Sequence, residues 1–100
     1  MQVRPIRSDE LEPARRLLAA NNWGPRVADP AVFAELVQRS QIALVAVDGD
    51  TVLGFLRAIT DGLFNGYISM VVVDEAHRGR GIGTALAFLA AFDADRKSVV

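Results

Sequence analysis

The sequence contains no cysteine and a single histidine. Without cysteine, disulfide bonds, thiolate chemistry and cysteine-based zinc sites are excluded, and one histidine with scattered carboxylates predicts no metal site. No apolar run reaches the roughly 18 residues of a membrane span. The N-terminal segment MQVRPIRSDELE turns acidic where a secretory signal peptide has an apolar core. We therefore expect a cytoplasmic protein that has no membrane partner.

The chain also lacks an excess of charge of either sign. Its 11 basic and 12 acidic residues leave a net charge of −1. The molecule as a whole therefore has no general attraction for nucleic acid, and any anion site must be local. A length of 100 residues, 51% of them hydrophobic, suits one globular domain that spans residues 1–100.

The N-terminal part of the chain predicts a strand at 2–6 followed by two helices. The first helix would be capped by Ser8 and end at the turn formers of 21–25. The second would begin at Asp29-Pro30 and end near residue 40. Apolar residues recur at helical spacing, at Leu11, Ala14, Leu17 and Leu18 in the first helix and at Val32, Phe33, Leu36 and Val37 in the second.

After residue 40 the apolar pattern becomes that of strands. Residues 42–47, 51–60 and 67–73 predict a three-stranded meander, with turn-rich connections between the strands. The strand at 67–73 is apolar over almost its whole length, which predicts burial on both faces. A helix at about 81–95 follows, and residues 98–100 are a short run that could begin another strand. The predicted fold class is α/β, with the order strand, two helices, three strands, helix.

The segment HRGRGIGT, residues 77–84, joins the last strand to the last helix. A helix N-terminus exposes backbone N–H groups without intrahelical partners, and these groups attract anions. Glycine gives an anion access to the backbone and permits positive φ. Gly79, Gly81 and Gly83 alternate here with Arg78 and Arg80, and Thr84 adds a hydroxyl. The pattern predicts a site for a phosphate or diphosphate, although a plain tight turn with solvated arginines is the simpler alternative.

Two familiar phosphate motifs do not fit this segment. A P-loop requires a lysine after its last glycine, and none is present here. A dinucleotide-binding fingerprint requires a glycine three residues after Gly81, where Thr84 stands instead.

The longer segment VVVDEAHRGRGIGTAL closely resembles the coenzyme-A-binding segment of the GCN5-related N-acetyltransferases, the GNAT superfamily. The signature of that superfamily, [RQ]-x-x-G-x-[GA], is met by Arg78, Gly81 and Gly83. The element order up to about residue 95 is also similar to that of the family. The resemblance implies a mixed, mostly antiparallel GNAT-like sheet and an N-acetyltransferase that uses acetyl-CoA.

The resemblance also implies roles for particular residues. The backbone of Met70, Val71, Val72 and Val73 would pair with the pantetheine arm, and a backbone N–H near Val71 would polarise the thioester carbonyl. The diphosphate would lie against Arg78, Gly79, Arg80, Gly81, Ile82, Gly83 and Thr84. The acceptor would be a primary amine on a small molecule or a peptide.

The sequence departs from the family pattern at its end, because it stops at Val100, before or at the point where the family's fifth strand would begin. Family members usually continue through further strands, which complete the acceptor site and often supply a tyrosine that protonates the leaving thiolate. The single tyrosine here, Tyr67, stands elsewhere, and Glu75 and His77 are only weak candidates for a general base. The leading hypothesis is an N-acetyltransferase, complete or completed by a dimer. The alternatives are a coenzyme-binding module without catalysis, and a small interaction protein whose glycine turn binds nothing.

Residues elsewhere could contact the acceptor or a partner chain. Asp61 and Asn65 lie in the last strand connection, where turn formation is the simpler role. Trp23 and Arg26 lie between the first two helices, where the family often places acceptor contacts, and an anchor for that loop is the simpler role. The outer edge of strand 67–73 would lack a neighbour, and unpaired edges invite pairing with another chain, so we expect a homodimer.

Overall fold

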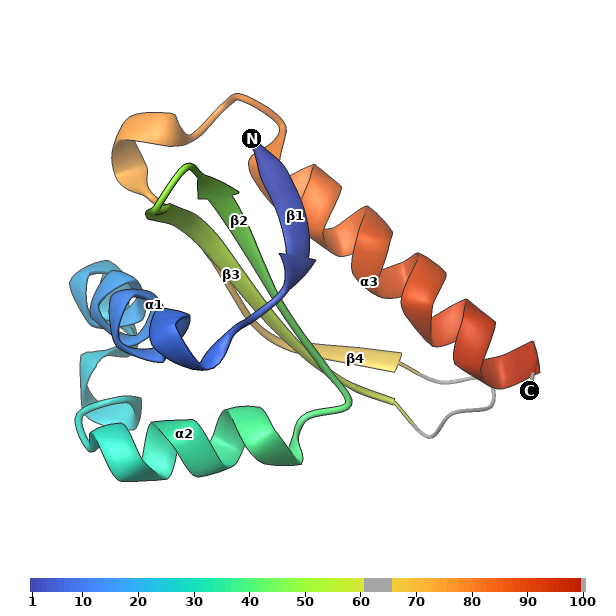
Figure 1. Ribbon diagram of the computed structural model, residues 1–100, viewed down its shortest axis with the longest axis horizontal. Helices are drawn as coiled ribbons and strands as arrows, with labels where there is room; N and C mark the ends of the chain where they lie inside the picture. The colour runs from blue at the N-terminus through green and yellow to red at the C-terminus, as the bar shows by residue number, and fades with distance from the viewer. Residues whose placement is uncertain (61–65, 100) are drawn as a thin grey trace.

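The computed structural model describes residues 1–60 and 66–99, with side chains as far as Ala90. Figure 1 shows a single sheet with α1 and α2 on one face and α3 on the other. The strands are β1 (Gln2–Pro5), β2 (Ile42–Asp48), β3 (Thr51–Thr60) and β4 (Gly66–Val73). The helices are α1 (Leu11–Leu18), α2 (Pro30–Arg39) and α3 (Ile82–Val99). The predicted fold class and element order are confirmed.

The sheet is antiparallel throughout, and its strands lie in the order β1-β2-β3-β4. The β2–β3 turn contains Gly49 at φ 60°, a value that glycine adopts without strain. Along β3, Arg57 pairs with Met70 but Ala58 pairs with Ile68, so Ser69 is an extra residue on β4. This β-bulge divides β4 into two short segments, and bulges re-aim the side chains beside them.

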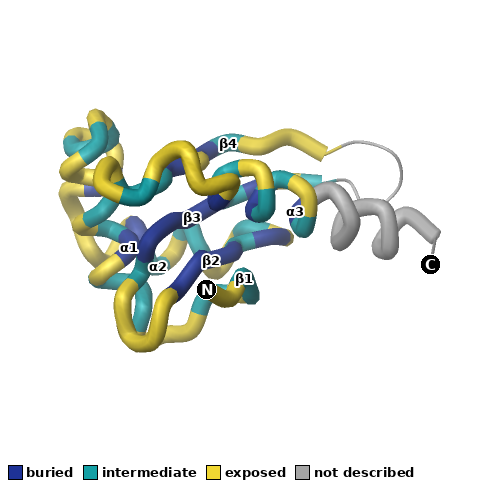
Figure 2. Tube along the Cα trace, turned by 90° about the horizontal axis from the view of Figure 1, so that it is seen from above, coloured by how far each residue is buried: buried dark blue, intermediate teal, exposed yellow. Residues whose placement is uncertain are grey.

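Each face of the sheet has its own hydrophobic core. On one face, α1 and α2 bury Leu18 and Phe33 against Phe55 of β3, and the two phenyl rings lie 5.8 Å apart. On the other face, Ile82 and Leu86 of α3 are buried among a second set of aliphatic side chains from β2 and β3. Figure 2 shows the result, with β2 and β3 buried in the middle of the domain. Each fully buried side chain of this size contributes about 1.5–3 kcal/mol relative to an exposed one.

Of the two predicted N-terminal caps, Ser8 and Asp29, one is correct. Asp29 caps α2 as expected, because its carboxylate accepts the backbone N–H groups of Ala31 and Val32 at 2.9 and 3.3 Å. The prediction for Ser8 is wrong, since Ser8 lies inside a 3₁₀ turn (Ser8–Glu10) that precedes α1. The Glu10 carboxylate instead accepts the backbone N–H of Arg7 at 2.9 Å. The side chain of Glu10, at the third position of this turn, therefore caps the turn in place of Ser8.

The predicted buried stripes of the two helices are largely confirmed. Ala14 and Leu18 are fully buried, and Leu36 and Val37 are partly buried against the same core. The prediction for Val32 is wrong, because its side chain is 53% exposed. It precedes the buried Phe33 at the start of α2, and a 100° step between neighbours turns it away from the sheet.

The prediction that β4 is buried on both faces is wrong. Met70 and Val72 are buried, but Ile68 and Val71 are exposed and Tyr67 is 68% exposed. Among the described strands β4 pairs only with β3, so it lies at the edge of the sheet. Figure 2 shows the first half of β4 running along the surface. The apolar run therefore predicted the strand correctly, but the prediction overestimated how much of the strand the helices cover.

The prediction of a new strand at residues 98–100 is wrong for Ser98 and Val99, which belong to α3. No glycine or proline follows Gly83 in the helix to end it. Continuing the helix satisfies backbone hydrogen bonds locally, whereas a three-residue strand needs a partner strand. Val100 lies outside the described residues.

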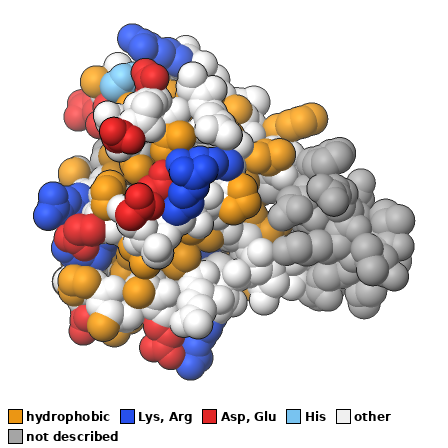
Figure 3. All heavy atoms as spheres, viewed as in Figure 1, with side chains coloured by type: hydrophobic (Ala, Val, Ile, Leu, Met, Phe, Trp, Pro, Cys, Tyr) orange, Lys and Arg blue, Asp and Glu red, His pale blue; other side chains and the backbone are white. Residues whose placement is uncertain are grey.

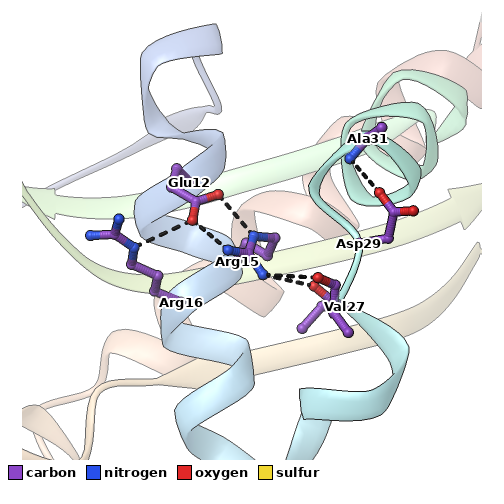
Figure 4. A network of polar contacts seen from close by, with 7 residues as sticks. Glu12, Arg15, Arg16, Val27, Asp29 and Ala31 are labelled. Carbon is purple, nitrogen blue, oxygen red and sulfur yellow. Dashed lines mark hydrogen bonds and ion pairs between the residues drawn. The ribbon is translucent and has the colours of Figure 1, made fainter.

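A network of polar contacts ties α1 to the loop that leads into α2 (Figure 4). Glu12 accepts hydrogen bonds from both Arg15 and Arg16. Arg15 also reaches across to the carbonyl oxygens of Val27 and Ala28, at 3.2 and 3.4 Å. Surface ion pairs of this kind contribute at most about 1 kcal/mol. The main effect of the network is therefore to position the loop, which carries residues of the candidate site.

A second ion pair is more deeply placed and predicts acid sensitivity. Arg4 donates two hydrogen bonds of 2.7 Å to Glu10, and their side chains are only 14% and 13% exposed. The hydrogen bonds from Arg4 lower the pKa of Glu10 below its ordinary value of 4.5. A group with a lowered folded-state pKa stabilises the fold fully above that ordinary value, and its contribution is lost as the pH falls through the folded-state pKa. We expect the free energy of unfolding to drop below about pH 4.5, and to drop less in Glu10→Gln.

Chemical denaturation at a series of pH values measures this effect. Glu35→Gln is the matched control, because Glu35 pairs with Arg39 on the exposed face of α2. The control should keep the wild-type pH profile. Equal profiles for the wild type and Glu10→Gln would contradict the assignment.

The surface of the domain carries mixed charge. Basic and acidic side chains lie next to one another over the face shown in Figure 3, in keeping with the net charge of −1. No helix in the described ranges is long and apolar enough to cross a membrane.

Candidate functional site

The candidate site begins where the chain leaves β4. A 3₁₀ turn (Glu75–His77) follows Val73, and the backbone N–H of Asp74 donates to the Leu53 carbonyl of β3 at 2.7 Å. The Asp74 carboxylate lies 2.7 Å from Nδ1 of His77, and the His77 backbone N–H donates to the Asp74 carbonyl. These contacts hold the turn against the sheet. They also fix His77 in the turn, and His77 is not among the residues that line the pocket described below.

The glycines of the junction differ in what they do. Gly79 and Gly81 have φ values of 83° and 79°, which side chains other than glycine rarely adopt. A Cβ at either position would meet nothing within 4 Å, so the backbone of the turn is open to an approaching ligand. Gly83 is in α3 without a positive φ, and a Cβ there would make only an ordinary 3.6 Å contact with Val73. Two of the three glycines therefore have the positive φ that the sequence predicted for this turn.

The start of α3 supplies unpaired donors. The first helical bond of α3 runs from the Ala85 N–H to the Gly81 carbonyl, at 2.9 Å. The N–H groups of Ile82, Gly83 and Thr84 thus precede the first intrahelical bond. The buried Ile82 side chain anchors this end of the helix to the sheet. An anion here would meet several amides and the positive end of a helix dipole.

A pocket of about 350 Å³ lies beside this helix start and joins three parts of the fold. The lining residues come from the chain after α1, from the end of β4 and from the glycine junction: Asn21, Trp23, Val71, Val72, Val73, Arg78 and Gly83. Five of these were predicted as coenzyme contacts from the sequence. The fold therefore brings the end of β4 and the junction together as expected.

The other predicted residues do not line this pocket. Gly79, Arg80, Gly81, Ile82 and Thr84 belong to the adjoining turn and helix start, and the Met70 side chain is buried in the core beneath α1 and α2. Glu75 is exposed in the 3₁₀ turn. Tyr67 lies four residues before Val71 on β4, which is roughly 13 Å along a strand. Asp61 and Asn65 lie outside the described residues.

Asn21 is a site residue that the sequence did not reveal. Its Oδ1 accepts a hydrogen bond from Nη2 of Arg78 at 2.5 Å, and its Nδ2 donates to the Leu17 carbonyl at 2.8 Å. Nε of Arg78 donates to the Val73 carbonyl at 3.2 Å. The next residue, Asn22, has φ 75°, a conformation that asparagine tolerates better than most residues. Two adjacent asparagines predicted a turn, but a partner 57 positions away left no signal in the sequence.

Because Asn21 orients Arg78, changing it should weaken binding of a phosphate ligand at the junction. We expect Asn21→Ala to raise the dissociation constant for coenzyme A by roughly 3- to 10-fold, since one hydrogen bond that orients a charged group is lost. Isothermal titration calorimetry measures the change. Asn22→Gly is the control, because it keeps the positive φ and removes a side chain that does not line the pocket. Equal affinity for Asn21→Ala and the wild type would contradict this role.

Trp23 and Arg26 are placed together beside the pocket. The guanidinium carbon of Arg26 lies 5.5 Å from the centroid of the Trp23 ring. Trp23 is partly buried and packs against the core of α1 and α2, while it also lines the pocket. It therefore anchors its loop, as the simpler prediction had it, and is also available for contact with a ligand.

Comparison with known proteins identifies the family. The chain matches the family model described as the acetyltransferase (GNAT) family over residues 5–98. It therefore belongs to the GNAT acetyltransferases, as the resemblance of the glycine junction predicted. No curated protein matches the chain in a sequence search.

Solved structures share its fold. An aminoglycoside 6'-N-acetyltransferase complexed with coenzyme A aligns with a TM-score of 0.84 at 22% identity, over 97% of this chain and 57% of that one. The aminoglycoside 6'-N-acetyltransferase from Enterococcus faecium gives 0.77 at 25%, over 97% and 57%. A ribosomal-protein-alanine N-acetyltransferase from Brucella melitensis biovar Abortus 2308 gives 0.78 at 25%, over 97% and 73%. The chain thus spans a little over half the length of the two aminoglycoside enzymes.

Proposed function

We propose that this chain binds acetyl-CoA and transfers its acetyl group to a primary amine. The observation that carries the proposal is the pocket in which the end of β4 meets the open, glycine-rich start of α3. Family membership and the coenzyme A bound by a structural neighbour of the same fold support it.

The residues present fit the coenzyme. Unpaired amides at the start of α3, together with Arg78 and Arg80, suit a diphosphate, and the backbone of Met70–Val73 suits an extended pantetheine arm. Acetyl-CoA bound there would supply the acetyl thioester that a primary amine attacks. A backbone N–H near Val71 would donate to the oxygen that gains negative charge. Removing one donor of this type typically lowers the rate about 10²- to 10³-fold.

A second candidate is a coenzyme-binding module without catalysis. None of the described residues that line the pocket is a carboxylate, a histidine or a tyrosine, so the lining provides no general acid or base. This observation favours a site that binds the coenzyme but needs a general acid or base from outside its lining for turnover.

Two measurements separate these functions. Calorimetric titration with acetyl-CoA and with CoA tests for binding, and a thiol-release assay with a panel of primary amines tests for transfer. Binding with thiol release supports the acetyltransferase, and binding without thiol release supports the module. Absence of binding to either coenzyme would remove both functions.

We also propose that the chain forms a homodimer through the first segment of β4. The Ser69 bulge separates Gly66–Ile68 from the segment assigned to the coenzyme, and Tyr67 and Ile68 expose apolar surface at this end. A charge on an edge strand blocks pairing with another chain, so Ile68→Lys should be monomeric in sedimentation velocity at micromolar concentration. Its affinity for acetyl-CoA should not change. A wild-type chain that sediments as a monomer would contradict the dimer.

A further inference from the structure

The extra residue on β4, Ser69, is held by a side chain of the neighbouring strand. Arg57 pairs with Met70 and Ala58 pairs with Ile68, so Ser69 has no counterpart among the described residues of β3. The residue that a β-bulge inserts is left out of the hydrogen-bond ladder, so other contacts must fix its position. In this fold the contact comes from Nη1 of Arg57, which donates to Oγ of Ser69 at 2.7 Å.

The same guanidinium also reaches the end of α2. Its Nε donates to Oγ of Ser40 at 2.6 Å, and that hydroxyl donates to the Leu36 carbonyl at 2.7 Å. Arg57, Ser40 and Ser69 are all partly buried. A guanidinium is a planar group whose donors have a fixed arrangement, so the two hydroxyls are held at a set distance from each other. Arg57 therefore ties the bulge of β4 to the end of α2.

The position of the bulge determines which backbone groups β4 offers at the edge of the sheet. Along an edge strand, successive N–H groups point alternately toward the neighbouring strand and away from it, and one inserted residue shifts this alternation for every residue that follows. The side chains show the shift, because the neighbours Ser69 and Met70 both lie on the face that α1 and α2 cover. In a regular strand, neighbours lie on opposite faces. Residues 71–73, which are proposed to hold the thioester, follow directly.

We propose that Arg57 is a positioning residue for acetyl transfer, because it holds the Ser69 bulge and so aims the backbone N–H near Val71 at the acetyl carbonyl. The inference rests on the proposed function and adds a residue from outside the lining of the pocket. Arg57 would act through the backbone of β4, without contact with the reacting atoms. A misplacement of about 1 Å can cost about 100-fold in rate, so a loosely held bulge would slow transfer even where the coenzyme still binds.

The test observes the acetyl carbonyl directly and does not depend on turnover. Calorimetry first establishes whether CoA and acetyl-CoA bind, which tests the proposed function separately. Infrared difference spectroscopy then measures the stretching frequency of the carbonyl in acetyl-CoA that is isotope-labelled at that carbon, since a hydrogen bond to the oxygen lowers the frequency. Binding to the wild type should lower it, and Arg57→Met and Ser69→Ala should each lose about half of that shift or more. Their affinity for CoA should stay within about twofold of the wild type.

Two further variants separate positioning from general stability. Ser69→Thr keeps the hydroxyl and should keep the wild-type frequency shift. Glu10→Gln breaks the ion pair with Arg4 of β1, at the opposite edge of the sheet, and should also keep the shift although it is less stable. With any amine that releases thiol, kcat of Arg57→Met should fall about 10- to 100-fold while KM for acetyl-CoA stays within about twofold.

Several results would overturn the inference. An unshifted carbonyl frequency in the wild type would show that no donor meets the acetyl group, and a full shift in either Arg57→Met or Ser69→Ala would show that the bulge needs no such contact. An equal loss of shift in Ser69→Thr or Glu10→Gln, or a parallel loss of CoA affinity, would indicate a general effect on the fold. An unchanged kcat in Arg57→Met would also contradict the role. Failure of CoA to bind would remove the inference together with the proposed function.

Discussion

Replacing Gly81 with glutamate should lower the affinity for acetyl-CoA by at least roughly 100-fold. The carboxylate would stand at the start of α3, where the diphosphate is proposed to accept backbone hydrogen bonds. Losing two such bonds to a charged group, each worth about 1.5–3 kcal/mol, accounts for a loss of this size before charge repulsion is added. Calorimetric titration measures the affinity, and circular dichroism confirms that the variant is folded.

Backbone strain needs its own control in this experiment. Gly81 has φ 79°, so a side chain there costs about 1–2 kcal/mol of stability. Gly49→Glu introduces the same charge at φ 60°, also in open space, but in the β2–β3 turn. It should lose similar stability and keep wild-type affinity. If Gly81→Glu bound acetyl-CoA as tightly as Gly49→Glu does, the anion site at the start of α3 would not exist.

Replacing Gly54 with alanine should destabilise the fold by about 1–3 kcal/mol, the usual cost of overpacking a core. A Cβ on Gly54 of β3 would lie 3.0 Å from Cδ1 of Leu86, 3.2 Å from the Val72 carbonyl oxygen and 3.3 Å from Cγ2 of Ile82. The carbonyl belongs to the sheet and cannot move freely, whereas Leu86 and Ile82 belong to α3, so we expect a shift of α3 away from β3. Because Ile82 and Leu86 lie in the first turns of α3, the shift should also weaken binding of acetyl-CoA.

Thermal unfolding and calorimetry together test this second prediction. A loss of 1 kcal/mol lowers the melting temperature of a domain of this size by about 4–8 °C. Gly24→Ala is the control, because a Cβ there would lie 3.7 Å from the nearest heavy atom and the residue has a helical φ of −45°. The control should melt within about 2 °C of the wild type. A Gly54→Ala variant with unchanged stability would show that α3 does not depend on close contact with β3.

The predictions from the sequence were most accurate where they depended on neighbours in the chain. The strand positions, the Asp29 cap and the turn at Gly49 follow from local spacing and backbone preference, and the structure confirms them, with strand ends shifted by at most one residue. The glycine junction is also local, so both its position before a helix and its positive φ values could be expected from residues 77–84. The failures at Val32 and Tyr67 concern burial, which depends on what packs against a residue from elsewhere in the chain.

What the sequence alone determined is the order of the elements, the location of the glycine-rich turn before α3 and the family to which the chain belongs. Only the tertiary structure decided that Asn21 and Trp23 lie beside that turn, and that a side chain on Gly54 would crowd the residues of α3 above it. The physical reason is the range of the interactions. Backbone preferences act between residues a few positions apart, whereas a pocket wall and a helix–sheet contact join residues that only the folded chain brings together.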